Sequence, residues 1–279
     1  MSGYIGINNK ARKIKSLYVG VDGIARKVKK AYIGDASGKA RLWYSSGTAL
    51  SGLAVGSILR IKENGSLAEF ILAQHNYNSG RALVVRRGNL ADKVNWGAQP
   101  NYLEDATDRH WGPIGSYSSG CYLRSWLNST YLSRFDSATQ ALIGTTNYRF
   151  NAPGNSTSFL SDSTAIFVLS AAEIYSFSGA GYIPNPGDGS LLPAAARSVL
   201  NAASGSWWTR SNSGQKNTVS GDDSGDTYYN GVLYWTGSKI EEGAGAMADN
   251  ALAMVRPCFT LPETAVVDDT GLLKGEESA

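Results

Sequence analysis

The sequence predicts an α+β protein in which a small β-rich N-terminal module precedes a larger domain with much irregular loop. Three observations support this class: short apolar–polar alternations around turn residues, two segments with helical spacing of apolar residues, and a long stretch rich in Gly, Ser, Asn and Asp. The chain has 279 residues, is 42% hydrophobic and contains 32 Gly, 15 Tyr and 7 Trp. This composition is typical of a globular protein whose short strands are joined by many loops.

Residues 1–46 are predicted to form a separate basic module of β-hairpins. Residues 11–20 recur as residues 25–34, at a spacing of 14 residues, and apolar residues alternate with basic ones within each copy. The pairs Asn8-Asn9 and Asp22-Gly23 favour tight hairpin turns. Isolated hairpins are only marginally stable. We therefore expect this module to need a partner surface or neighbouring copies in an oligomer.

Charge separates this module from the rest of the chain. Residues 1–44 hold ten Lys or Arg and two Asp, a net charge of +8, whereas the remaining residues hold 16 Lys or Arg against 21 Asp or Glu, a net charge of −5. A basic segment of this kind attracts acidic partners, such as another protein, a nucleic acid or a membrane surface.

After a Gly/Ser-rich linker at 47–54, residues 55–264 are expected to form the second domain. Asn64-Gly65 indicates a hairpin, and residues 82–86 a further strand. Residues 120–135 have the spacing of a helix whose apolar face includes Leu123, Trp126 and Leu127.

Further elements follow this helix. A short helix is expected after Asp136, a buried strand at 165–169, a helix starting at the capping box Ser170–Glu173, and a closing strand within 251–261. Residues 265–279 are acidic and are expected to form a flexible tail.

Catalytic motifs are missing from the sequence. It contains no phosphate-binding loop and no nucleophile elbow, and its two histidines, His75 and His110, lie apart. Cys121 and Cys258 do not form a disulfide framework, and we expect them to stay reduced, with their pairing left open. We therefore expect no enzymatic activity, no catalytic residues and no bound cofactor, and no metal site apart from one candidate.

That candidate is the acidic segment at 222–226. Asp222, Asp223 and Asp226 lie around a Gly, and closely spaced carboxylates can supply the oxygen ligands of calcium. The alternative is an ordinary solvated acidic loop, because the segment lacks a terminal bidentate Glu.

The segment at 204–245 mixes Tyr and Trp with Ser, Asn, Asp and Gly, which is the composition of a binding surface built from loops. We expect Trp207 and Trp235 to be core residues and the polar loops at 211–230 to be exposed. Irregular loops held by a rigid scaffold are where binding residues concentrate. The predicted ligand contacts are Asn212, Gln215, Asn217, Asp223, Tyr228, Tyr229 and Asn230.

Four motifs taken together resemble one family of bacterial and phage domains related to the C-type-lectin-like fold of formylglycine-generating enzymes. They are a helix with Leu123, Arg124, Trp126, Leu127 and Asn128, the strand and helix start at 165–173, a strand with Trp207, Trp208, Arg210 and Ser211, and a closing strand with Val255, Arg256 and Pro257. The resemblance covers roughly residues 53–262. It implies a C-type-lectin-like domain, but Cys121 and Cys258 do not map onto the reactive cysteines of those enzymes.

The same scaffold is similar to the variable proteins of diversity-generating retroelements, which bind ligands through loops placed like residues 211–230. The basic repeat resembles N-terminal modules of phage tail proteins. The resemblance therefore implies a phage tail adhesin, or receptor-binding protein, that acts from the virion on a bacterial surface glycan or protein. Residues 1–46 would dock on phage tail proteins, in a homo-oligomer.

Two alternatives remain open: an enzyme on the same scaffold, or a purely structural tail component. We expect no nucleic-acid partner. We also expect no membrane insertion, since no apolar run is long enough to span a bilayer and residues 1–18 lack the apolar core of a secretory signal.

Overall fold

The computed structural model describes most of the chain in separate segments. These are residues 4–7, 10–13, 17–28, 30–34, 40–45, 47–92, 94, 122–151, 159–177, 187–202, 205–212, 216–218, 227–229, 232–243 and 254–274. Within them the protein combines several antiparallel sheets with short helices, as expected for an α+β protein.

The N-terminal region consists of three hairpins, each a two-stranded antiparallel sheet. Asp22 and Gly23 both have positive φ, 52° and 75°, as in the tight turn predicted for this pair. The turn predicted at Asp22-Gly23 is therefore confirmed, whereas Asn8 and Asn9 lie outside the described residues. The strands are β1 (Tyr4–Ile7) with β2 (Lys10–Lys13), β3 (Tyr18–Val21) with β4 (Ile24–Lys27), and β5 (Lys30–Gly34) with β6 (Ala40–Ser45).

The centre of the second region is a five-stranded antiparallel sheet in the order β13-β19-β10-β9-β8. The turn between β8 and β9 places Asn64 at φ 51° and Gly65 at φ 77°, so this predicted hairpin is also confirmed. The strands are β8 (Ile58–Glu63), β9 (Ser66–Asn78), β10 (Arg81–Arg86), β13 (Ile166–Val168) and β19 (Pro257–Pro262).

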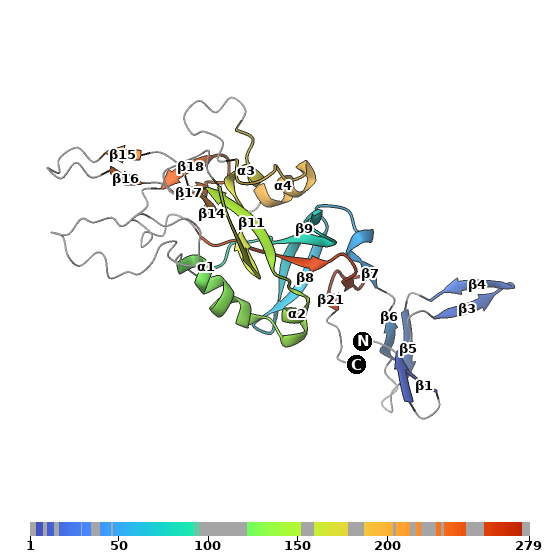
Figure 1. Ribbon diagram of the computed structural model, residues 1–279. Helices are drawn as coiled ribbons and strands as arrows, with labels where there is room; N and C mark the ends of the chain where they lie inside the picture. The colour runs from blue at the N-terminus through green and yellow to red at the C-terminus, as the bar shows by residue number, and fades with distance from the viewer. Residues whose placement is uncertain are drawn as a thin grey trace.

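Both faces of this sheet are covered, because the consecutive residues 70–73 and 82–85 are all buried although neighbouring side chains point to opposite faces. Figure 1 shows the run from α1 to α2 on one side of the sheet and α3 with α4 on the other. The helices are α1 (Tyr122–Trp126), α2 (Ser137–Leu142), α3 (Ala171–Ile174) and α4 (Ala194–Asn201).

Helix α1 continues through a π turn, Leu127–Tyr131, and a 3-10 turn, Leu132–Arg134. Leu123 and Leu127 are fully buried, as predicted, whereas Trp126 is only partly buried and packs at the edge of the core. The predicted helix after Asp136 is also present, since the Asp136 carboxylate accepts from Thr139 N at 2.7 Å and caps α2.

Smaller sheets complete the architecture. One pairs β11 (Thr146–Asn151) with β12 (Phe159–Thr164). A three-stranded sheet has the order β14-β17-β18, with β14 (Trp207–Asn212), β17 (Val232–Trp235) and β18 (Ile240–Gly243). A last hairpin pairs β15 (Lys216–Thr218) with β16 (Thr227–Tyr229).

The structure corrects the predictions for both ends of the second region. The expected linker at 47–54 contains β7 (Thr48–Ala49) and the 3-10 turn Leu50–Gly52, and Leu50 is fully buried. The expected flexible tail contains β20 (Val266–Val267), which pairs with β7, and β21 (Leu273–Lys274), which pairs with β20. These segments lie far apart in the sequence, and their pairing accompanies the burial of Leu50, Val267 and Leu273. A local sequence pattern does not reveal such pairing.

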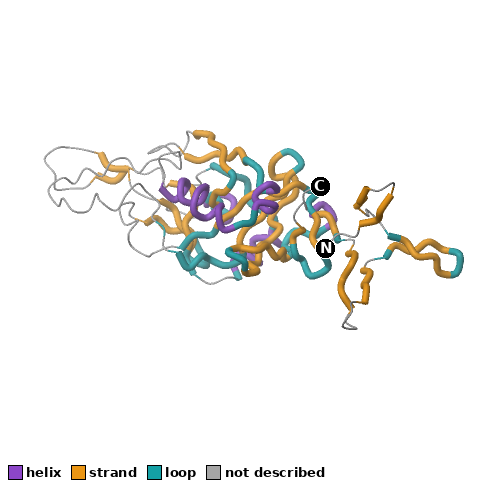
Figure 2. The backbone as a smooth tube through the Cα atoms, turned by 90° about the horizontal axis from the view of Figure 1, so that it is seen from below, coloured by secondary structure: helices purple, strands orange, loops and turns teal. Residues whose placement is uncertain are grey.

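Figure 1 shows β15 and β16 at one end of the molecule and the N-terminal hairpins at the other, near both chain termini. Figure 2 shows the same separation from below, with the N-terminal hairpins pointing in different directions. Among the residues that the structure describes, none of the helices has the length and apolar character needed to cross a membrane.

Candidate functional site

The loop segment singled out in the sequence leads to the end of the molecule that carries β15 and β16, which we call the distal end (Figure 1). The chain enters it from β14 and leaves it into β17, and these two strands pair with each other at Trp207↔Trp235 and Trp208↔Tyr234. Trp207 and Trp235 are 0% and 3% exposed, which confirms their assignment to the core. A buried strand pair therefore fixes both ends of the segment.

Four of the predicted contact residues lie in strands at this end. Asn212 is the last residue of β14, and β15 pairs with β16 so that Asn217 lies opposite Tyr228 and Lys216 opposite Tyr229. Gln215, Asp223 and Asn230 lie outside the described residues, as do Asp222 and Asp226 of the candidate calcium site. Within the segments that the structure describes, no three His, Cys, Asp or Glu side chains are grouped so as to share a metal ion.

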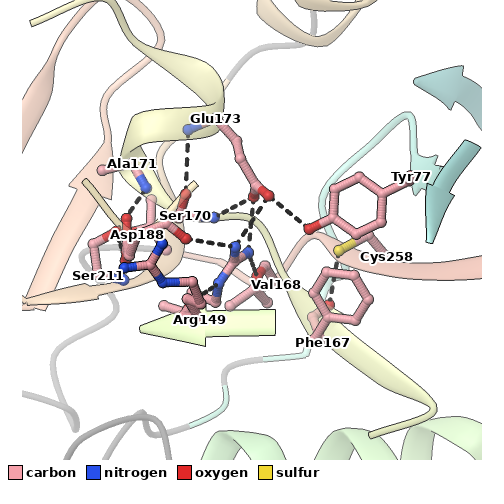
Figure 3. A network of polar contacts seen from close by, with 12 residues as sticks. Tyr77, Arg149, Phe167, Val168, Ser170, Ala171, Glu173, Asp188, Ser211 and Cys258 are labelled. Carbon is pink, nitrogen blue, oxygen red and sulfur yellow. Dashed lines mark hydrogen bonds and ion pairs between the residues drawn. The ribbon is translucent and has the colours of Figure 1, made fainter. Parts of the chain in front are cut away.

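Beside the last residues of β14, through which the chain enters the distal end, lies a largely buried polar cluster that we call the Glu173 cluster (Figure 3). Its members are Tyr77, Ser170, Glu173, Asp188, Arg210 and Ser211, which come from β9, α3, β14 and the segment before α4.

Glu173 is the centre of this cluster. The predicted capping box is present: Ser170 N donates to Glu173 Oε2 at 2.8 Å, and Glu173 N donates to Ser170 Oγ at 3.2 Å. The same carboxylate accepts a hydrogen bond from Tyr77 OH at 2.6 Å. One residue thus starts α3 and ties it to β9.

Arg210 binds this carboxylate through two nitrogens, with Nη1 2.8 Å from Oε2 and Nη2 3.0 Å from Oε1. Its remaining N–H groups donate to backbone carbonyls, so the guanidinium satisfies its hydrogen-bonding capacity inside the protein. These carbonyls belong to Arg149, at 2.8 Å, Val168, at 3.0 Å, and Asp188, at 3.3 Å. A bidentate pair with this geometry fixes orientation as well as charge.

Ser211 extends the cluster by one residue toward the distal end. Its hydroxyl donates to Asp188 Oδ2 at 2.7 Å and accepts from Ala171 N at 2.8 Å. Gly189 lies so close to the cluster that an added Cβ would come within 2.5 Å of Ser170 Oγ and 2.6 Å of Glu173 Cγ. Strand β14 is therefore held by side chains up to Ser211, the last residue before Asn212. The expectation that residues 211–230 are exposed is wrong at Ser211, which is fully buried because its hydroxyl binds Asp188 and Ala171.

Burial and the Glu173 charge together shift the pKa values of the cluster. Burial, with a further contribution from the Glu173 charge, raises the pKa of Tyr77 well above its usual value, so Tyr77 stays a neutral donor. Burial also raises the pKa of Asp188 to about 6. Burial by itself lowers the pKa of Arg210, but the neighbouring Glu173 carboxylate outweighs it and the pKa is raised overall. The cluster therefore joins β9, α3 and β14 through charged and hydrogen-bonded side chains.

Residues of the other motifs that resemble the C-type-lectin-like family also make structural contacts. The Asn128 side chain donates to Ile166 O at 2.7 Å and accepts from Ile166 N at 2.9 Å, which joins the helical run to β13. Arg256 lies over the Trp207 ring, 4.6 Å from its centroid, and donates to Leu200 O at 2.8 Å. These motif residues therefore hold the layers of the domain together.

Cys258 is fully buried, with its thiol 3.3 Å from Phe167 O, and it is a free cysteine. Burial raises the pKa of this thiol well above its usual value, which disfavours the reactive thiolate. Cys121 lies outside the described residues.

The sequence identified Ser170 and Glu173 by their spacing, and Arg210 and Ser211 by the resemblance, but it gave no sign of Tyr77 or Asp188. Tyr77 lies at the end of a long strand and Asp188 in a Gly/Pro-rich segment. Neither position carries a local motif, so only the folded chain brings these two residues to Glu173 and Ser211.

A family model described as "Domain of unknown function (DUF6273)" matches residues 101–263. The match takes in every member of the Glu173 cluster except Tyr77. No curated protein and no solved structure matches the chain.

Proposed function

The chain belongs to the DUF6273 family, whose description names no activity, and from its own residues we propose that it is a phage tail adhesin. In this proposal the domain that follows the N-terminal hairpins, including β7, β20 and β21, is C-type-lectin-like and attaches to a bacterial surface glycan or protein through the distal end. The protein acts from the virion, where residues 1–46 dock on the tail.

The main support for the proposal is that side-chain contacts fix the end of β14, where the distal segment begins. Arg210 and Ser211 are 2% and 0% exposed and are bound by side chains from α3 and the segment before α4. Only Asn212 separates them from the polar stretch at 213–215. A rigid base lowers the entropy lost when the loops beyond it bind a ligand.

The residues beyond this base suit recognition. Tyr228 and Tyr229 lie in a strand of the β15–β16 hairpin, beside Asn217 and Lys216. Tyrosine offers a large amphipathic contact surface with few rotatable bonds, and neighbouring amides supply hydrogen bonds. Hot spots at interfaces are few and often aromatic, so Tyr228 and Tyr229 are the strongest candidates for ligand contacts.

The enzymatic alternative receives less support. Cys258 is a buried thiol with a raised pKa, and the ionisable residues of the Glu173 cluster are used in ion pairs and hydrogen bonds inside the core. This arrangement therefore favours binding through an exposed surface over catalysis by a reactive side chain.

The experiment is a cell-binding assay with the fluorescently labelled full chain and a panel of intact bacterial strains. Replacing Tyr228 and Tyr229 together by Ala should weaken binding to a recognised strain at least tenfold, which corresponds to about 1.4 kcal/mol. The matched control replaces Tyr18 and Tyr32, which are 58% and 55% exposed in the N-terminal hairpins, and should leave cell binding unchanged.

The proposal fails if no strain is bound, or if both double variants bind as the unchanged chain does. Loss of folding in the Tyr228/Tyr229 variant, read from its thermal melt, would instead assign these residues to the core. Treating cells with periodate or with protease before the assay separates a glycan ligand from a protein ligand.

A further inference from the structure

The three N-terminal hairpins share one strand register. In each, a Tyr-Ile/Val-Gly strand runs opposite an Ala-Arg strand, so that Ile or Val always faces Arg and Gly always faces Ala. The equivalent pairs are Tyr4↔Lys13, Ile5↔Arg12 and Gly6↔Ala11; Tyr18↔Lys27, Val19↔Arg26 and Gly20↔Ala25; and Tyr32↔Leu42, Ile33↔Arg41 and Gly34↔Ala40.

This register redefines the repeat. The sequence copies at 11–20 and 25–34 each begin in one hairpin and end in the next, whereas the structural unit is a whole hairpin that occurs three times. The backbone register therefore repeats the same pairing, of Ile or Val with Arg and of Gly with Ala, three times within residues 4–45.

The middle hairpin shows what one such unit exposes. Every residue of β3 and β4 is exposed. Val19, Val21 and Ile24 are 50%, 39% and 60% exposed, and the register places them on one face with Arg26. Tyr18, 58% exposed, lies on the other face with Lys27. Both faces of the hairpin therefore combine apolar side chains with a positive charge.

The backbone is also available for contact. Among the described strands, β3 and β4 pair only with each other, so each leaves one edge of N–H and C=O groups without a strand partner. Exposed edges of this kind accept an added strand, and a single two-stranded hairpin gains stability when a further surface covers it.

The chemistry of the hairpins selects the class of partner. Exposed Val and Ile side chains gain free energy only when an apolar surface covers them, which favours a protein over a nucleic acid or a polyanionic glycan. The net charge of +8 over residues 1–44 requires acidic groups around that apolar centre and opposes packing these hairpins against those of another copy.

We propose that residues 4–45 are three copies of one docking unit, and that each copy binds the same acidic, apolar-centred surface of a partner protein that presents this surface more than once. Linked binding sites of this kind raise the overall affinity well above that of one unit, because the second and third contacts are intramolecular. The proposal rests on the proposed function only in assigning docking to residues 1–46.

The experiment measures binding of the full chain to each structural protein encoded in the same gene cluster, purified and immobilised one at a time. Replacing Ile5, Val19 or Ile33 singly by Ser should raise the dissociation constant by similar factors, each on the order of tenfold or more, because each change removes one of three linked contacts. The triple variant should not bind measurably.

Leu67→Ser is the matched control. Leu67 is 57% exposed in β9, outside the three N-terminal hairpins, so its replacement should leave docking unchanged. The thermal melt of each variant should match that of the unchanged chain. Raising salt should weaken docking, and the triple variant Arg12→Ala/Arg26→Ala/Arg41→Ala should reduce this salt dependence.

Several results would overturn the proposal. They are binding to none of the purified proteins, loss of binding from only one of the three single variants, equally tight binding of polyglutamate or double-stranded DNA, and hairpin-dependent self-association in sedimentation velocity. The Tyr228/Tyr229 variant should dock normally, and the Ile5/Val19/Ile33 variant should bind cells normally. Failure of docking and failure of cell attachment are therefore told apart.

Discussion

Arg210 and Glu173 form a bidentate ion pair inside the protein, with side chains that are 1% and 2% exposed and N–O distances of 2.8 and 3.0 Å. Removing one partner of such a pair leaves a buried charge without compensation. We predict that Arg210→Met lowers the free energy of unfolding by about 3–5 kcal/mol, measured by urea titration.

The double variant Arg210→Met/Glu173→Gln tests the cause. Gln at position 173 keeps the capping geometry but removes the charge. The loss in the double variant should be clearly smaller than the sum of the two single losses, because no unpaired charge remains. Additive losses would show that the two residues act independently.

Asp188 gives a pH dependence whose sign follows from its raised pKa. Its pKa is about 6 in the folded protein, against an ordinary value of 3.8. The folded state therefore binds the proton more tightly, so the stabilisation is complete below the ordinary value and is lost as pH rises through about 6. A shift of this size corresponds to roughly 3 kcal/mol at most.

Asp188→Asn should remove this dependence, because an amide does not ionise and its oxygen still accepts from Ser211. We expect the variant to be more stable than the unchanged protein at pH 8 and to lose that advantage at pH 4.5. Chemical unfolding at both pH values measures the difference. An equal difference at the two pH values would assign the titration to another group.

Trp126 and Leu127 are neighbours with different burial. Leu127 is fully buried, whereas Trp126 is half-buried. The centroid of the Trp126 ring lies 6.0 Å from the centroid of the Tyr131 ring and 5.2 Å from the guanidinium of Arg134. We predict that Leu127→Ala costs about 2–5 kcal/mol and that Trp126→Ala costs less, about 1–3 kcal/mol. A larger loss for Trp126→Ala in thermal or urea unfolding would place it in the core.

The start of the second domain can be tested by truncation. Removing residues 1–46 should leave a folded domain that still binds cells. Removing residues 1–54 should lower the melting temperature markedly, because it deletes β7, the buried Leu50 and the hydrogen bonds from Leu50 N to Ala265 O and from Ser51 N to Glu263 O. Equal stability of the two truncated chains would restore 47–54 as a linker.

Several local elements were predictable from the sequence because a few neighbouring residues specify them. Asn64-Gly65 adopts positive φ at little cost, Asp136 caps the helix that follows it, and Ser170 with Glu173 forms a capping box. The helical run that contains Leu123 and Leu127 was equally clear, because its apolar residues recur at the helical period.

Partial burial was harder to predict. Trp126 fits the apolar face of its helix, but the core ends beside it, and where a core ends depends on which elements pack there. The hairpin repeat was visible as a period of 14 residues, but the strand register decided which residues make up one unit.

The candidate site also combines features that the sequence predicts with contacts that only the folded structure creates. The sequence alone determined that the segment at 211–230 is polar and aromatic, that strands bracket it, and that a capping box starts at Ser170. Only the tertiary structure brought Tyr77 and Asp188 to this box, buried Arg210 against it, and paired Val266 with Ala49. Contacts between distant segments form because they satisfy buried charges and cover apolar surface, and that requirement exists only once the chain has folded.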